Sequence, residues 1–298
     1  MMKPQPFFWL LVIGFLPIQL LACDVCGCGS GASGIGLFWA QPRNSIQMTG
    51  FLQRFQTANE SEIRTRDHFL SLNLVFRHRL TQSFYGQIAL PYHSNRRDGR
   101  LGHQSIQGIG DARITGHWIA WQRDNATRSG YLEIGGGVIL PTGSYDPTIH
   151  DRELPENFNP GKGSWGWSVQ SQFNVNAGWL SYILQAEWKA YAPTTDGYRF
   201  GQEASATGIL AVNRLRSNRL QFVPWISGSF QWVQTDQYGN GQDVHGTGGM
   251  AVLGGLGLQC TYSDLAVGIN AQLPVFQYFS AGEVSARTRV SVNLGWFF

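Results

Sequence analysis

Long segments of this chain alternate apolar and polar residues one by one, and this pattern constrains the fold more than any other feature. The segment FLSLNLVFRHRL (69–80) is a clear example, and LSYILQAEWKAY (180–191) and VSARTRVSVNLGWFF (284–298) repeat it. Successive side chains point to opposite faces of a β-strand, whereas a helix needs an apolar repeat of about 3.6 residues. The pattern therefore predicts β-strands that each have one apolar and one polar face.

Twelve such segments follow one another along the chain. They cover residues 45–57, 67–80, 83–94, 106–122, 129–142, 164–176, 179–191, 202–215, 219–234, 245–260, 264–276 and 283–298. Each is long enough to cross a bilayer as a tilted strand, which takes about 9–11 residues. Tight turns alternate with longer connections, which we place at 58–66, 95–105, 143–163, 192–201, 235–244 and 277–282. This alternation is typical of outer-membrane barrels, whose short turns are periplasmic.

The composition agrees with a membrane barrel. Charged residues make up 14% of the chain, against about 25% in typical soluble domains. The chain has 37 glycines and 13% aromatic residues, and after residue 22 no apolar run reaches the length of a membrane-spanning helix. We expect residues 44–298 to form an all-β, transmembrane, antiparallel up-and-down barrel of about twelve strands in the outer membrane of a Gram-negative bacterium. The net charge of +3 is too small to indicate a nucleic-acid partner.

Charged residues recur on the face opposite the apolar one, and we expect them to line a wet lumen. These residues are Arg77, Arg79, Asp111, Arg113, His117, Glu133, Glu187, Lys189, Arg287 and Arg289. Charges of both signs have two interpretations, an open pore that selects ions or a narrow lumen filled by salt bridges. About eight strands leave a filled interior and about sixteen leave a channel, so both interpretations stay open.

The N-terminus predicts export. Lys3 precedes an apolar run that ends at Ala22, and we expect residues 1–22 to be a signal peptide. Residues 23–43 then form a periplasmic segment rich in cysteine and glycine. The chain ends in Trp296-Phe297-Phe298, and a terminal aromatic on the last strand resembles the signal that the outer-membrane insertion machinery recognises. We therefore expect this machinery and the lipids of the outer membrane as partners.

Three cysteines, Cys23, Cys26 and Cys28, follow the export signal, and a fourth, Cys260, lies far away. The stretch LLAC (20–23) matches a lipoprotein signal with Cys23 as the acceptor, although Asp24 favours inner-membrane retention in enteric bacteria. Alternatively, the three thiolates bind Cu(I) or Zn²⁺, although three are one short of a structural zinc site. A disulfide between Cys26 and Cys28 or Cys260 is the third interpretation.

Catalysis is not expected from this sequence. Nucleophilic chemistry needs a histidine within reach of a serine and an orienting group. His78 lies on the apolar face without an obvious serine partner, and most of the other histidines lie in or near predicted loops. We therefore predict that the protein is not an enzyme.

Two segments resemble a known family. GIGDARITGHWIAW (108–121) opens with a G-x-G-D turn into a strand, and GGGVILPTG (135–143) ends a strand with L-P-T-G. Outer-membrane proteins of the meta-pathway phenol degradation type carry the same features. The matching residues here are Gly108, Gly110, Asp111, Leu140, Pro141, Thr142 and Gly143. The resemblance implies a channel or transporter for small, apolar solutes. The competing hypothesis is a closed-lumen structural or metal-handling protein.

Overall fold

The structure, a computed structural model, describes residues 42–58, 64–99, 102–125, 128–149, 154–213, 215–217, 220–282 and 284–298. Its strands are β1 (Ser45–Ala58), β2 (Arg64–Arg79), β3 (Phe84–Gly99), β4 (Gly102–Ile109), β5 (Arg113–Asp124), β6 (Arg128–Ile139), β7 (Gly166–Ala177), β8 (Leu180–Tyr191), β9 (Glu203–Val212), β10 (Leu215–Ser217), β11 (Leu220–Val233), β12 (Gly249–Tyr262), β13 (Leu265–Phe279) and β14 (Val284–Phe297). Two short 3-10 helices are η2 (Glu156–Phe158) and η3 (Ser280–Gly282). Within these ranges, none of the helices is long and apolar enough to span a bilayer.

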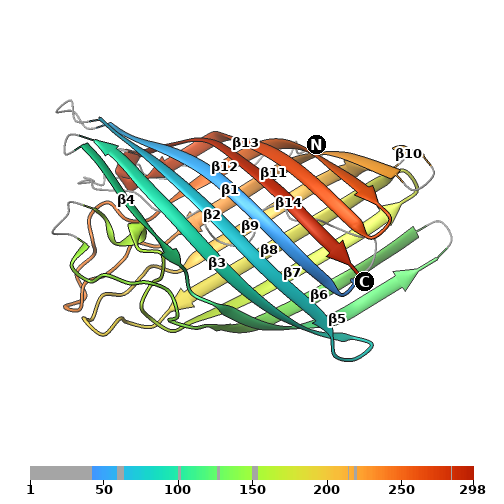
Figure 1. The fold of residues 1–298 in the computed structure, drawn as a ribbon, viewed down its shortest axis with the longest axis horizontal. Helices are drawn as coiled ribbons and strands as arrows, with labels where there is room; N and C mark the ends of the chain where they lie inside the picture. The colour runs from blue at the N-terminus through green and yellow to red at the C-terminus, as the bar shows by residue number, and fades with distance from the viewer. Residues whose placement is uncertain are drawn as a thin grey trace, which may run out of the picture.

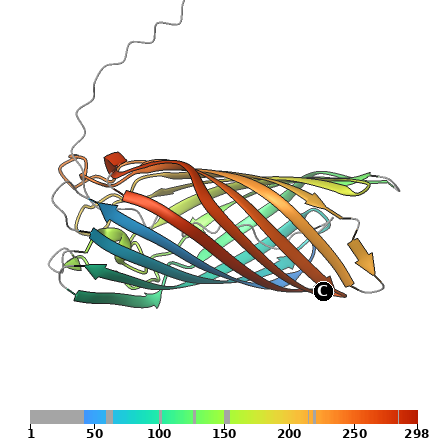
Figure 2. The same ribbon diagram turned by 90° about the horizontal axis from the view of Figure 1, so that it is seen from above.

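The strands form one closed antiparallel barrel (Figures 1 and 2). Consecutive strands pair around the wall, and β1 pairs with β14 from Ser45 opposite Phe297 to Thr57 opposite Val284. Both β4 and β5 pair with β3, and both β9 and β10 pair with β11. Each of these couples occupies one position in the wall, so the fourteen strands fill twelve positions. The prediction of a twelve-stranded barrel is confirmed.

Two details of the predicted strands are wrong. The segment 106–122 is not one strand, because the wall is interrupted between Ile109 and Arg113. The segment 95–105 is not a long loop, because β3 and β4 remain paired up to Gly99 opposite Gly102. The charged residues of this segment predict a loop. The outer face of a strand does not have to be apolar, however, where the strand extends beyond the membrane.

The alternation sends apolar residues outward and polar residues inward. On β2, Leu72 and Leu74 are exposed, whereas the intervening Asn73 is buried. The same order occurs on β14, where Val292 is 45% exposed and Asn293 is 1% exposed. An apolar outer face and a polar interior reverse the arrangement of a soluble barrel and suit a barrel surrounded by lipid.

We expect Val292→Arg to impair folding into bilayers, because an arginine on the lipid-facing side near the midplane costs about 2–4 kcal/mol. Val292→Leu keeps an apolar side chain at the same position and should fold like the wild type. The free energies of unfolding of both variants in lipid vesicles measure the effect. Equal stability of the two variants would show that Val292 does not face lipid.

Candidate functional site

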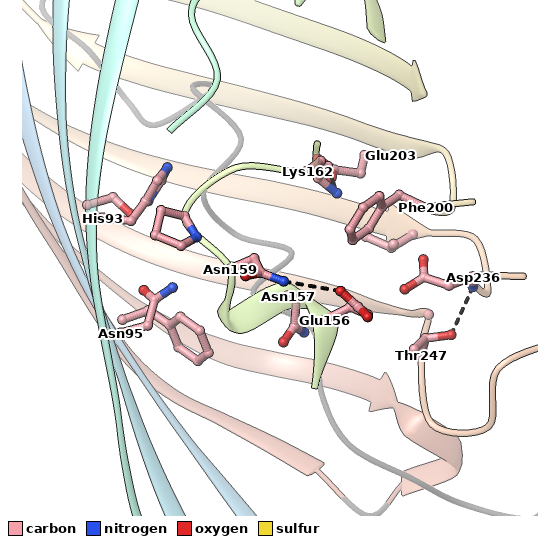
Figure 3. A pocket seen from close by; sticks show the side chains of 15 residues that line it. His93, Asn95, Glu156, Asn157, Asn159, Lys162, Phe200, Glu203, Asp236 and Thr247 are labelled. Atoms are coloured by element: carbon pink, nitrogen blue, oxygen red, sulfur yellow. Dashed lines mark hydrogen bonds and ion pairs between the residues drawn. The ribbon is translucent and has the colours of Figure 1, made fainter. Parts of the chain in front are cut away.

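The long connection between β6 and β7 enters the barrel. Its apolar residues Ile149, Leu154 and Phe158 are 0–2% exposed and join one buried cluster with wall residues such as Phe55 and Phe279. Figure 3 shows the short helix η2 of this connection lying inside the barrel, beside the strands of the wall. We call the described residues 140–149 and 154–165 of this connection the inserted loop. Burial of its apolar side chains holds this loop in an interior that is otherwise largely polar.

Phe158 is the most closely held residue of the inserted loop. The centroids of the Phe158 and Phe69 rings are 4.9 Å apart. The Arg97 guanidinium carbon lies 4.9 Å from the centroid of the Phe158 ring. The Asn95 side-chain amide also donates a hydrogen bond of 2.9 Å to the Phe158 carbonyl. Arg97 is in turn fixed by Asp67 through two hydrogen bonds of 2.8 Å. Residues of two neighbouring wall strands, β2 and β3, therefore contact Phe158 and hold it in place.

Asp111 fastens both ends of the inserted loop. It lies in the break between β4 and β5, where it is not part of the strand ladder. One carboxylate oxygen accepts a hydrogen bond of 2.9 Å from the Gly143 backbone amide, and the other accepts one of 2.7 Å from the Lys162 amide. The Thr142 hydroxyl accepts a hydrogen bond of 2.8 Å from the Ala112 amide nearby. The two motifs found in the sequence thus meet at the base of the loop.

The glycines of these motifs permit a close backbone crossing. A Cβ atom on Gly143 would lie 2.6 Å from the Gly161 Cα atom and 2.7 Å from the Gly110 carbonyl carbon. These distances are shorter than side chains tolerate, and the obstructing atoms belong to the backbone. Glycine is therefore required where the two ends of the inserted loop pass the strand break.

Ion pairs in the interior join strands of the wall to one another and to the inserted loop. Arg113 on β5 pairs with Glu187 on β8. The Lys189 ammonium lies 3.3 Å from a carboxylate oxygen of Glu203, and the ammonium of Lys162 lies 2.9 Å from the other oxygen. Lys162 belongs to the inserted loop, so this network joins the loop to β8 and β9. Such contacts across the interior place these side chains in the lumen.

A second network lies nearer the rim of short turns. Arg77 on β2 donates two hydrogen bonds, of 2.9 and 2.5 Å, to Glu133 on β6. The His117 Nδ1 atom lies 2.8 Å from the same carboxylate. The Arg77 guanidinium carbon also lies 4.4 Å from the centroid of the Tyr85 ring. A buried pair of this kind is costly to break, because removing one partner leaves an uncompensated charge.

The ten residues predicted to line the lumen have four different locations. Seven point into the barrel: Arg77, Arg113, His117, Glu133, Glu187, Lys189 and Arg289. Asp111 holds the inserted loop, and Arg79 is exposed at the short-turn rim, where it donates to the Gln82 carbonyl.

The location of Arg287 corrects the expectation from the sequence. The pairing of β1 with β14 contains a bulge, so that Arg289 is opposite Gln53 but Ala286 is opposite Phe55. Buried Arg289 donates to Gln53, whereas exposed Arg287 donates to Gln56 at 2.7 Å. The bulge changes the phase of the alternation, and the two arginines lie on opposite faces of the wall.

Two cavities lie in the lumen on the two sides of the inserted loop. The first, of about 100 Å³, is lined by residues including Asn73, Arg113 and Lys189. The second, of about 70 Å³, is lined by residues including Asn95 and Asp236 and is shown in Figure 3. Pro160 and Lys162 line both cavities. The inserted loop therefore narrows the lumen between them.

The carboxylates of Glu156, Glu203 and Asp236 line the second cavity. Glu156 belongs to the inserted loop and accepts a hydrogen bond of 3.1 Å from Asn159. Burial raises the pKa of Glu156 to about 7, and the negative charges of Asp196 and Asp236 act in the same direction. Asp236 itself accepts hydrogen bonds from the Tyr198 hydroxyl at 2.7 Å and from a backbone amide. The neutral form of Glu156 thus fits the seated loop better than the charged form.

Sequence reasoning missed one contact between a serine and a histidine. The Ser71 hydroxyl and the His93 Nδ1 atom lie 2.8 Å apart inside the barrel. Both residues line the two cavities. Their positions on adjacent strands, directly opposite each other, explain the contact.

The predicted cysteine cluster, Cys23, Cys26 and Cys28, lies outside the described residues. Cys260 is half-buried on β12, three residues before the turn into β13. Within the described ranges, no group of three or more histidine, cysteine, aspartate and glutamate side chains is arranged to hold a metal ion.

A closed barrel with an apolar outer face and a polar interior defines the outer-membrane class of β-barrel proteins. Residues 44–287 match the family described as "putative MetA-pathway of phenol degradation". The chain therefore belongs to this family, and the family resemblance of its motifs is confirmed.

Two solved structures share the fold. An outer-membrane channel from Pseudomonas putida F1 has a TM-score of 0.64 and 14% identity, covering 87% of this chain and 97% of that chain. The β domain of the Bordetella autotransporter Brka has a TM-score of 0.51 and 10% identity, covering 86% of this chain and 100% of that one. No curated protein matches this chain.

Proposed function

We propose that the protein is a passive outer-membrane channel for small solutes, with its N-terminal segment in the periplasm. The observation that carries this proposal is the inserted loop. The two lumen cavities are separated by a connection that is held through a few directed contacts, and the hydrogen-bonded wall does not depend on it. A lumen that is narrowed by a loop can open without unfolding the barrel.

The lining supports a solute with both an apolar part and a polar group. Charged side chains occupy the middle of the lumen, and apolar clusters lie beyond them at both ends. Toward the short-turn rim the clusters contain Tyr85, Ile119, Tyr131, Ile183, Ile209, Ala211, Val223 and Trp225. A phenol has this combination, which agrees with the description of the family.

Conductance in planar bilayers tests the proposal. We expect the purified wild-type barrel to give resolved current steps that a small phenol reduces. The competing function, a structural or metal-handling protein with a closed lumen, is supported by the ion pairs that cross the interior. If neither the wild type nor a variant with a shortened inserted loop conducts current, this result favours the second function.

We propose that the aromatic C-terminus serves insertion of the barrel into the outer membrane. The exposed Trp296 and Phe298 have ring centroids 5.1 Å apart on the outer surface.

We propose that Cys23 carries a lipid. Two acyl chains make a stable anchor at about 0.8 kcal/mol per buried CH₂ group, and here they would tether residues 24–43.

The intact mass of the mature protein tests the lipid. We expect Cys23→Ser to lose the mass of the acyl chains and to keep a folded barrel, whereas Cys26→Ser and Cys28→Ser leave the mass increment in place. An unmodified Cys23, with Cu(I) or Zn²⁺ bound in proportion to the free thiols, would contradict lipidation and favour the metal site.

A further inference from the structure

The outer surface carries a group of basic side chains at the long-loop end of β14, β1, β2 and β3. We define the outer arginine patch as Arg54, Arg66, Arg96 and Arg287, all of which are exposed. His68 and His103 lie among them. The strands of this sector extend beyond the rest of the wall, as Figure 1 shows for β1 to β4. The patch therefore lies on protein that continues past the apolar outer surface.

The strand register brings the basic side chains together. Arg54 on β1 lies directly opposite His68 on β2, and His68 lies directly opposite Arg96 on β3. No hydrogen bond or ion pair joins Arg54 or Arg66 to any described residue. The described residues therefore concentrate positive charge at this position, and such a surface suits an anionic ligand.

One acidic residue of the described wall lies within the patch. Asp98 accepts a hydrogen bond of 3.0 Å from Arg96 and also contacts His103. Among the described residues of the patch, four arginines accompany one aspartate, counting the histidines as neutral. Asp98 thus orients Arg96 but does not neutralise the patch.

The patch begins where the apolar belt ends. Along the outer face of β2, Arg66 and His68 are followed by Leu70, Leu72 and Leu74, which are exposed. The same rim on other strands is aromatic, with exposed Trp167, Trp188, Phe276 and Tyr278. On the outer face of the described strands, the basic side chains of this rim lie on β14, β1, β2 and β3, at the level where lipid headgroups meet the wall.

A surface groove accompanies the patch. Its volume is about 550 Å³, and its lining includes Gln56, Arg66, Asp98, His103 and Arg287. The glycines of the tip of the β3–β4 hairpin, Gly99 and Gly102, also line it and leave space beside the guanidinium groups. Arg287 is held toward the groove by its two hydrogen bonds to Gln56, of 3.0 and 2.7 Å. The groove has room for a phosphorylated sugar.

We propose that the outer arginine patch binds the phosphate groups of the glycolipid in the outer leaflet of the outer membrane. Guanidinium groups donate paired, charge-assisted hydrogen bonds to phosphate oxygens. The neighbouring leucines of β2 contact the acyl chains of the same lipid, and the groove receives its sugars. The inference rests on the proposed outer-membrane location and is independent of whether the lumen conducts.

Native mass spectrometry of the detergent-purified barrel with bisphosphorylated lipid A tests this site. The test variant replaces Arg54, Arg66 and Arg96 by Gln. The matched control replaces Arg123 and Arg128 by Gln, which removes exposed positive charge at the opposite rim. We expect the test variant to lose roughly tenfold or more in affinity, as follows from losing at least one charge-assisted contact. The control variant should bind like the wild type.

Several outcomes would overturn the proposal. Unchanged binding by a folded test variant would do so, as would equal binding of dephosphorylated lipid A by the wild type. Full displacement of lipid A by millimolar inorganic phosphate would show a phosphate site without lipid specificity. Arg66→Gln alone should give a smaller loss in the same direction and replaces the triple variant if that variant does not fold. A barrel that binds lipid A but conducts no current contradicts the channel and leaves this inference intact.

Discussion

Phe158→Ala should convert the barrel to a state of much larger conductance. Removing a buried phenylalanine ring costs about 3–5 kcal/mol. Here this cost weakens the contacts that hold the inserted loop inside the barrel. The ring contacts Phe69 and Arg97 on the wall and has no part in the strand ladder. The wall should therefore remain folded while the loop leaves the lumen more often. Current steps in planar bilayers measure the change.

Two further variants make this result specific. Phe84→Ala removes a ring of the same size from the outer face, where it is 40% exposed, and should leave the conductance at the wild-type value. Asp111→Ala releases the hydrogen bonds to Gly143 and Lys162 and should raise the conductance through the other attachment of the loop. A Phe158→Ala barrel that is folded and conducts like the wild type would show that the inserted loop does not limit the current.

The barrel was predictable because its signal is local. A strand with lipid on one side and a polar interior on the other must alternate with a period of two, as Leu72, Asn73 and Leu74 do. Each segment therefore carries its own evidence, and closure follows because an open sheet edge would leave backbone groups unpaired in lipid. The bulge near Arg287 was not predictable in this way, because one displaced residue changes the face of a side chain without changing the composition.

The inserted loop depends on contacts between distant residues. The G-x-G-D and L-P-T-G motifs were visible in the sequence, but their meeting at Asp111 requires the fold, since Gly143 and Lys162 are 32 and 51 residues away. One signal for the loop was available. Ile149, Leu154 and Phe158 are apolar residues in a long polar connection, and such residues need burial somewhere. In the folded barrel these three side chains are buried in the lumen.

The current through the wild-type barrel should also depend on pH. The pKa of Glu156, raised by burial and by the charge of Asp196 to about 7, lies above the usual value of 4.5. The seated loop therefore binds the proton more tightly than the released loop. The seated loop is most stable below about pH 4.5. Its stability falls as the pH rises from about 4.5 to about 7 and reaches its lower limit above about pH 7. Each unit of the pKa difference changes the equilibrium of the loop about tenfold.

We therefore expect the conductance to increase between about pH 5 and pH 8. Lys162 stays charged through this window, because Glu203 raises its pKa despite its burial. Glu156→Gln mimics the neutral acid and should give a low conductance at every pH. Asp243→Asn, in an exposed part of the connection between β11 and β12, should keep the wild-type pH profile. A Glu156→Gln barrel with an unchanged profile would assign the pH dependence to another group.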